Sequence, residues 1–176
     1  MQRILNEISE DFFFSNGPAE IEEMINNGDI DKEAVEKKWL GFPPATLKDI
    51  HAKETQLGTT LPPSYREFLL TSNGFKHVSV FLDNLFPIDI VDWTMNTEPK
   101  WWFDIIDQHD LKVTDEEYFV YGPKQRSELA REEYQKHSLK LCDWRDGMCV
   151  FLNPIVKHDE EWEVLVYATW YPGTRR

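Results

Sequence analysis

The sequence lacks the patterns that many enzymes and membrane proteins carry. It has eight glycines, and none of them forms a G-x-G-x-x-G series or a P-loop, which are the usual cradles for nucleotide phosphates. Its five histidines are dispersed, without an H-E-x-x-H motif or a paired C-x-x-C motif. Its longest apolar runs, such as Val164–Ala168, are far shorter than the ~20 residues of a membrane-spanning helix. We therefore expect no cofactor, no metal and no membrane span.

Cysteine is scarce as well. The two cysteines, Cys142 and Cys149, flank Asp146-Gly147, a dipeptide typical of a two-residue hairpin turn. In that hairpin Cys142 faces Phe151, so the cysteines become diagonal neighbours, too far apart for a disulfide. We expect reduced core residues; a longer loop that pairs them is the alternative.

Basic residues are outnumbered, since 32 acids and 19 bases give a formal charge of -13. Residues 1–36 hold ten acids and two bases, a balance of -8, which leaves -5 for the rest. Without clustered Lys and Arg, direct binding to nucleic acid is disfavoured, whereas a basic protein partner would be steered to this surface. Negative charge also serves solubility, so charge alone does not decide between partners.

The composition is that of a compact globular protein, with 41% hydrophobic, 14% aromatic and 29% charged residues. Its length suits one folded unit, in which we distinguish an acidic helical extension, residues 1–36, from an α+β domain, residues 37–176. Acidic residues near the N-terminus interrupt what would be the apolar part of a signal peptide. A cytoplasmic location is the expectation.

Hydrophobic spacing and end signals predict helices early in the chain and strands later. Helices are expected over 4–13, 18–26, 31–39, 46–57 and 62–72, with Leu47, Ile50 and Leu57 turned inward in the fourth and Asp31 and Thr46 as caps. Strands are expected over 77–82, 85–90, 118–121, 139–143, 148–152 and 162–169, and a mostly exposed helix over 127–137. The segment 94–110 suits either a helix or a strand. This order favours an α+β fold with a bent, largely antiparallel sheet on which the N-terminal helices pack.

One block of residues carries a resemblance. It runs from Trp39 through Leu57-Gly58 and Leu61-Pro62-Pro63-Ser64-Tyr65 to Asn73-Gly74, and it resembles the SUKH superfamily, in particular its cell-wall-assembly-regulator-like (Smi/Knr type) branch. The family pattern takes in Trp39, Gly41, Pro44, Glu54, Leu57, Gly58, Leu61, Pro62, Tyr65, Phe68, Leu69, Asn73 and Gly74. Later pieces, including Trp170-Tyr171-Pro172-Gly173, extend the resemblance to about residue 173. Family members commonly continue past this point, so we expect the last segment to differ.

The resemblance implies a non-enzymatic protein that binds other proteins. Bacterial members are best known as immunity proteins that neutralise toxins, often nucleases, and eukaryotic members act as regulatory or scaffold proteins. An immunity protein with a basic cognate toxin as its partner is the leading hypothesis, and a regulatory or scaffold module is the second. An enzyme is the third, because no nucleophile or acid/base constellation is evident.

Candidate partner-binding residues come from two regions. The first is the acidic extension, with Glu20, Glu22, Glu23 and Asp29; the second surrounds Trp101 and Trp102, with Asp104 and Asp107 as an acidic rim. Core burial is the alternative for the two tryptophans. Two polar clusters, Gln108-His109-Asp110 and His158–Glu161, are read as solvated loops rather than cation sites. Glu54 interrupts an apolar helix face, which favours an ion pair or a hydrogen bond to nearby backbone.

Overall fold

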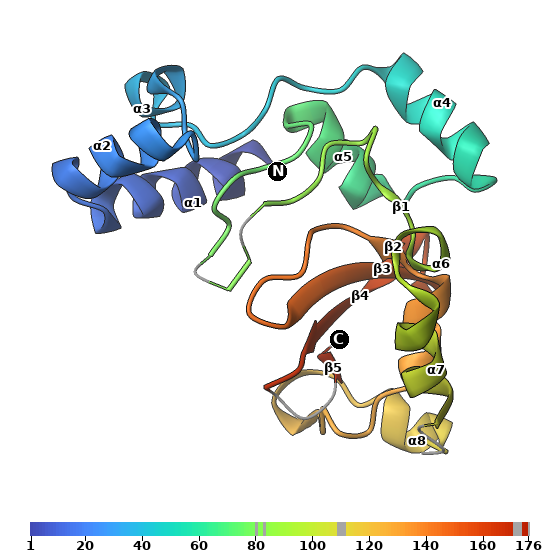
Figure 1. Ribbon diagram of the computed structural model, residues 1–176. Helices are drawn as coiled ribbons and strands as arrows, with labels where there is room; N and C mark the ends of the chain where they lie inside the picture. Colours follow the sequence, from blue (N-terminus) through green and yellow to red (C-terminus); the bar gives the residue numbers. More distant parts are fainter. Residues whose placement is uncertain (80, 83, 109–111, 171–173, 176) are drawn as a thin grey trace. The chain divides into compact units, whose positions relative to one another are not determined.

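The computed structural model describes residues 1–79, 81–82, 84–108, 112–170 and 174–175. By internal contacts the chain forms two compact units, Met1–Asp89 and Ile90–Arg176. The first is mainly helical and the second carries the sheet (Figure 1), which confirms the α+β class. The boundary after residue 36 and the packing of the N-terminal helices on the sheet stay predictions.

The helices of the first unit begin and end where local signals place them. They are α1 (Gln2–Ser15), α2 (Pro18–Asn27), α3 (Lys32–Lys37), α4 (Leu47–Leu57) and α5 (Pro63–Thr71). Gly28 ends α2 in the left-handed conformation, and the Asp31 side chain caps α3. Thr46 and Asp49 form the expected capping box of α4. The core of this unit includes Leu5, Ile30, Leu40, Ile50, Leu61, Leu69 and Phe75.

One inward position on α4 was predicted wrongly. Ile50 and Leu57 are buried, but Leu47 is 55% exposed. The buried face is completed instead by Lys53, whose ammonium donates a hydrogen bond to the Asp89 carbonyl at 3.0 Å. At 100° per residue, Leu47 lies about 90° from the centre of that face. A lysine with a backbone partner therefore displaces a leucine from the core side.

The strands expected over 77–82 and 85–90 are not formed by the described residues of those ranges. Single bridges join Gly41 to Phe75 and Phe75 to Leu85 instead. Pro87 has no N–H, and the Ile88 N–H donates to the Asn73 side chain at 2.8 Å, so neither can support a regular ladder there. Residues 80 and 83 lie outside the described residues.

The second unit is built on an antiparallel sheet of order β1-β2-β3-β4-β5. The strands are β1 (Asp92–Trp93), β2 (Leu139–Lys140), β3 (Met148–His158), β4 (Glu161–Ala168) and β5 (Thr174–Arg175). Strands over 148–152 and 162–169 are thereby confirmed, and β3 is longer than expected. A register shift interrupts the β3–β4 ladder between Asn153 and Lys157.

Short helices accompany this sheet (Figure 1): α6 (Thr94–Thr97), α7 (Lys100–Gln108), α8 (Asp115–Tyr118), η1 (Gly122–Lys124) and η2 (Glu132–His137). The ambiguous segment 94–110 is thus helical over 94–97 and 100–108. The strand predicted over 118–121 is wrong, because Thr114 and Glu117 cap a helical turn that ends at Tyr118. The helix predicted over 127–137 is a 3-10 helix over its second half, and its Gln135 is buried.

The hairpin around the cysteines differs from its predicted register. Arg145 pairs with Met148 across the Asp146-Gly147 turn as expected. The main ladder, however, is shifted so that Lys140, rather than Cys142, lies opposite Phe151. Both cysteines are buried and free, and their sulfur atoms lie 3.7 Å apart.

Candidate functional site

The acidic extension presents its charge to solvent. All ten carboxylates of residues 1–36 are exposed. Some have local partners: Glu20 accepts a hydrogen bond from the Gly17 N–H at the start of α2, and Glu33 pairs with Lys37. That pairing raises the pKa of Lys37, through the hydrogen bond and the charge of Glu33. Glu7 pairs with Arg3, and Asp31 pairs with Lys76 and caps α3.

Seven of these carboxylates form no ion pair with any residue that the structure describes: Glu10, Asp11, Glu20, Glu22, Glu23, Asp29 and Glu36. Beside two of them on α1 lies Phe14, which is 91% exposed. An exposed aromatic ring within a field of unpaired carboxylates is a feature typical of protein-binding surfaces. The sequence indicates an exposed ring in the run Phe12-Phe13-Phe14, because three consecutive residues on a helix cannot all face the core.

The predicted Trp101-Trp102 pair is divided between surface and core. Trp101 is 61% exposed, and Ile105, one turn further along α7, is also exposed. Trp102 is half-buried and packs against Trp144 and Phe151, with ring centroids 5.8 and 6.4 Å away. Only Trp101 is therefore presented to solvent as a hot-spot candidate.

The rim expected around Trp101 is less acidic than the sequence suggests. Asp104 pairs with Lys100 at 2.5 Å, and Asp107 pairs with Lys136. Each carboxylate in this rim thus has a cation beside it. Asp104 and Asp107 are thus both paired, whereas the acidic extension contains carboxylates without an ion pair among the described residues.

Other candidate clusters do not assemble a reactive centre. Glu54 has both expected partners, because its carboxylate accepts from the Leu61 N–H at 2.9 Å and lies 3.4 Å from the Arg66 guanidinium. His158 and Glu161 pair across the exposed tip of the β3–β4 hairpin. Of Gln108-His109-Asp110, the last two lie outside the described residues. Within the described ranges, no group of three or more metal-ligating side chains gathers.

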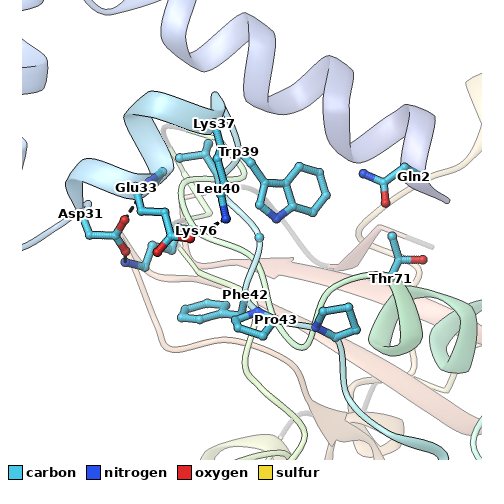
Figure 2. Close-up of a pocket in the computed structure, with 13 residues that line it drawn as sticks. Gln2, Asp31, Glu33, Lys37, Trp39, Leu40, Phe42, Pro43, Thr71 and Lys76 are labelled. Carbon is cyan, nitrogen blue, oxygen red and sulfur yellow. Dashed lines mark hydrogen bonds and ion pairs between the residues drawn. The ribbon is translucent and has the colours of Figure 1, made fainter.

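A pocket of about 470 Å³ lies in the first unit (Figure 2). We call it the Trp39 pocket. Its lining combines aromatic and proline side chains, the main chain of a glycine and charged side chains. The lining residues are Gln2, Asp31, Glu33, Ala34, Lys37, Trp39, Leu40, Gly41, Phe42, Pro43, Pro44, Thr71 and Lys76. Figure 2 shows α3 on one side of the extended segment 39–44 and Thr71 of α5 on the other.

Charges in the Trp39 pocket are arranged in pairs. Asp31 lies 4.0 Å from the Lys76 ammonium, which also lies 5.5 Å from the centre of the Phe42 ring. Glu33 pairs with Lys37 on the same helix. The pocket therefore offers aromatic and proline surface with neutralised charges at its rim, an arrangement suited to binding a peptide rather than to acid/base chemistry.

The family-pattern residues mostly serve the fold. Buried members are Leu57, Leu61, Pro62, Tyr65, Phe68, Leu69 and Gly74; Trp39, Gly41, Glu54 and Asn73 are half-buried, and Pro44 and Gly58 are exposed. Gly58 ends α4 in the left-handed conformation, and the Asn73 side chain accepts a hydrogen bond from the Ile88 N–H. Trp39, Gly41 and Pro44 line the pocket, which brings them together with Lys76 from outside the pattern.

These features define an α+β protein with an exposed acidic helical surface and a mixed aromatic and charged pocket. A family model, the SMI1 / KNR4 family (SUKH-1), matches residues 44–175. The chain belongs to this family. Comparisons with curated proteins and with solved structures gave no significant match. In the described part of the chain, no helix has both the length and the apolar character required to cross a membrane.

Proposed function

We propose that this protein is an immunity protein, which binds a cognate protein toxin and neutralises it by covering the toxin's active site. Membership of the SMI1 / KNR4 family is consistent with an immunity protein or a regulatory module. The observation that carries the proposal is the exposure of all ten carboxylates in residues 1–36, seven of them without an ion pair in the described chain. A basic partner, such as a nuclease with its phosphate-binding surface, is the kind of toxin that such a surface favours.

Under this proposal the protein acts in the cytoplasm, without catalysis and without a cofactor. Phe14 and Trp101, the most exposed aromatic side chains on α1 and α7, are the proposed anchors. The candidates Glu20, Glu22, Glu23 and Asp29 supply long-range attraction, which accelerates encounter more than it strengthens the final complex.

The second candidate function is a regulatory or scaffold module. The Trp39 pocket favours it, because a pocket with aromatic, proline and paired-charge lining suits a segment of another protein without requiring that this partner be a toxin. Genomic neighbourhood separates the two functions. A toxin gene beside this gene favours immunity, and its absence favours the scaffold.

The test is a calorimetric titration, at low salt, of the full chain with the toxin encoded beside its gene. Tight binding is expected for the wild type, and stopped-flow mixing should show slower association for a variant carrying Glu20→Gln, Glu22→Gln, Glu23→Gln and Asp29→Asn. A matched control removes four exposed charges from the second unit through Glu116→Gln, Glu133→Gln, Asp159→Asn and Glu160→Gln. No detectable binding by the wild type would contradict the proposal.

A further inference from the structure

The segment Leu40–Phe42 is the outer strand of a small ladder in the first unit. The Lys76 N–H donates to the Leu40 carbonyl at 3.0 Å, and the Phe42 N–H donates to the Gly74 carbonyl at 3.4 Å. On its other side Phe75 exchanges two hydrogen bonds with Leu85, at 2.8 and 3.1 Å. The ladder order is therefore 41, 75, 85, and segment 40–42 lies at one edge.

Gly41 holds an unpaired donor and acceptor at this edge. Because the hydrogen bonds to the inner strand involve residues 40 and 42, the N–H and C=O of Gly41 point away from it. Neither group has a hydrogen-bond partner among the described residues. Glycine has no side chain, so its contribution to the wall of the Trp39 pocket is its main chain.

Such an edge is a template for another strand. Half-buried backbone groups gain free energy from a partner, and an added strand supplies one donor and one acceptor at the spacing that Gly41 requires. The flanking positions limit the contact, because Pro43 has no N–H and its carbonyl already accepts from Asn73 at 3.4 Å. A short stretch of extended chain, held by two hydrogen bonds, fits this edge.

The walls identify the side chains that such a strand would bring. Trp39 and Phe42 offer rings to apolar or β-branched side chains, and both lysines of the pocket are paired with Asp31 and Glu33. Asp29, two residues before the lining residue Asp31 in the sequence, is exposed and has no ion pair within the described chain, so the unpaired charge that adjoins the pocket in the sequence is negative.

We propose that the Trp39 pocket binds an extended, basic peptide segment of a partner protein by adding it as a strand to the edge at Gly41. Side chains alternate along such a segment, so apolar residues face the rings and a lysine or arginine faces the carboxylates. This mode of binding applies to a toxin and to a regulated protein alike, so its test is separate from that of neutralisation.

The experiment is an NMR titration of the ¹⁵N-labelled full chain with a blocked peptide of alternating lysine and valine. We expect the Gly41 amide to shift downfield and its hydrogen exchange to slow at millimolar peptide. Two comparison peptides test what the binding requires. One is N-methylated at its central amides and tests the main-chain hydrogen bonds; in the other, glutamate replaces lysine and tests the preference for positive charge. Both are expected to bind at least about tenfold more weakly. An unmoved Gly41 amide, or equal binding of the N-methylated peptide, would overturn the proposal.

Variants supply an independent arm. Gly41 itself is unsuitable, because an added Cβ would lie 2.3 Å from the Ser72 hydroxyl. Thr71→Trp fills the pocket from α5, and Thr55→Trp on α4 is its control, since both threonine hydroxyls donate to the carbonyl four residues earlier. Peptide binding should fall at least about tenfold in Thr71→Trp and stay unchanged in Thr55→Trp. If Thr71→Trp does not fold, the N-methylated peptide decides; if it folds and binds normally, the proposal is wrong.

Discussion

At the scale of single residues, Glu54 shows how a charge on an apolar helix face is accommodated. Its side chain is 12% exposed and joins α4 to the entry of α5 through the Leu61 N–H and Arg66. Leu61 lies between the two helices, so its N–H has no acceptor within a helix, and the Glu54 carboxylate supplies one. A catalytic role needs a second reacting group, and these two contacts already account for the residue.

Replacing Glu54 tests this structural role. Glu54→Ala leaves the Leu61 N–H without its acceptor and the Arg66 guanidinium without its carboxylate partner, and we expect a loss of about 1–3 kcal/mol in the free energy of unfolding. Glu54→Gln keeps an acceptor and should lose less. Urea denaturation of both variants measures the difference. If the two variants unfolded at the wild-type midpoint, the assigned contacts would not stabilise the fold.

At the scale of elements, the ends of helices were predictable because their signals are local. Thr46 with Asp49, Gly28 and Asp31 each act within four residues of the end they define. The strand predicted over 118–121 failed because a local signal, the capping box of Thr114 and Glu117, outweighs its aromatic residues, whereas the side-chain partners of such segments are distant. Tyr118, for example, is held by the Glu163 carboxylate, to which its hydroxyl donates at 2.7 Å. An aromatic-rich segment alone does not reveal such a partner.

The candidate site divides in the same way. Exposure of the acidic extension was predictable, because ten carboxylates in 36 residues cannot be buried. The Trp39 pocket was not, since its wall joins Gln2, segment 31–44, Thr71 and Lys76 through tertiary contacts. The family pattern included Trp39 and Gly41, but it gave no sign of an open strand edge.

The capping boxes predict a dependence on pH. Hydrogen bonds from the Thr46 hydroxyl and N–H lower the pKa of Asp49 from its ordinary 3.8. A lowered carboxyl pKa stabilises the fold above the ordinary value, and this contribution is lost as the pH falls through the folded-state pKa. We expect Thr46→Ala to raise the pKa of Asp49 in an NMR titration. Glu117, whose pKa is lowered by Thr114, is the internal control; an unchanged Asp49 titration would refute the assignment.

The tight turn of the β3 hairpin makes a steric prediction. Gly147 has a φ of 74°, and an added Cβ would lie 2.0 Å from the Thr169 hydroxyl. Gly122, at 75°, has open space around it. Gly122→Ala should therefore lower the free energy of unfolding by only about 1–2 kcal/mol, the strain of alanine in a left-handed conformation. Gly147→Ala should lower it by more. Thermal unfolding measures both, and adding Thr169→Ala to Gly147→Ala should reduce the excess, because it removes the hydroxyl and leaves only the Thr169 Cβ at 3.1 Å. Equal losses in the two single variants would argue against the contact.

At the scale of the whole molecule, the formal charge of -13 makes association with a basic partner depend on salt. The Debye length falls from about 10 Å at 0.1 M salt to about 3 Å at 1 M, which screens exposed carboxylates. We expect the on-rate for the cognate toxin to fall steeply with salt while the off-rate changes little. Stopped-flow measurements over a salt series provide both rates. A salt-independent on-rate would contradict steering by the acidic extension.

Neutralisation is the central claim, and growth measures it most directly. Cells that make the toxin encoded beside this gene are grown with and without the full chain, while the abundance of both proteins is monitored. The account predicts that growth is restored when this protein is present and that the purified toxin loses its activity at equimolar amounts of it. Toxicity that persists when both proteins are folded and abundant would contradict the account.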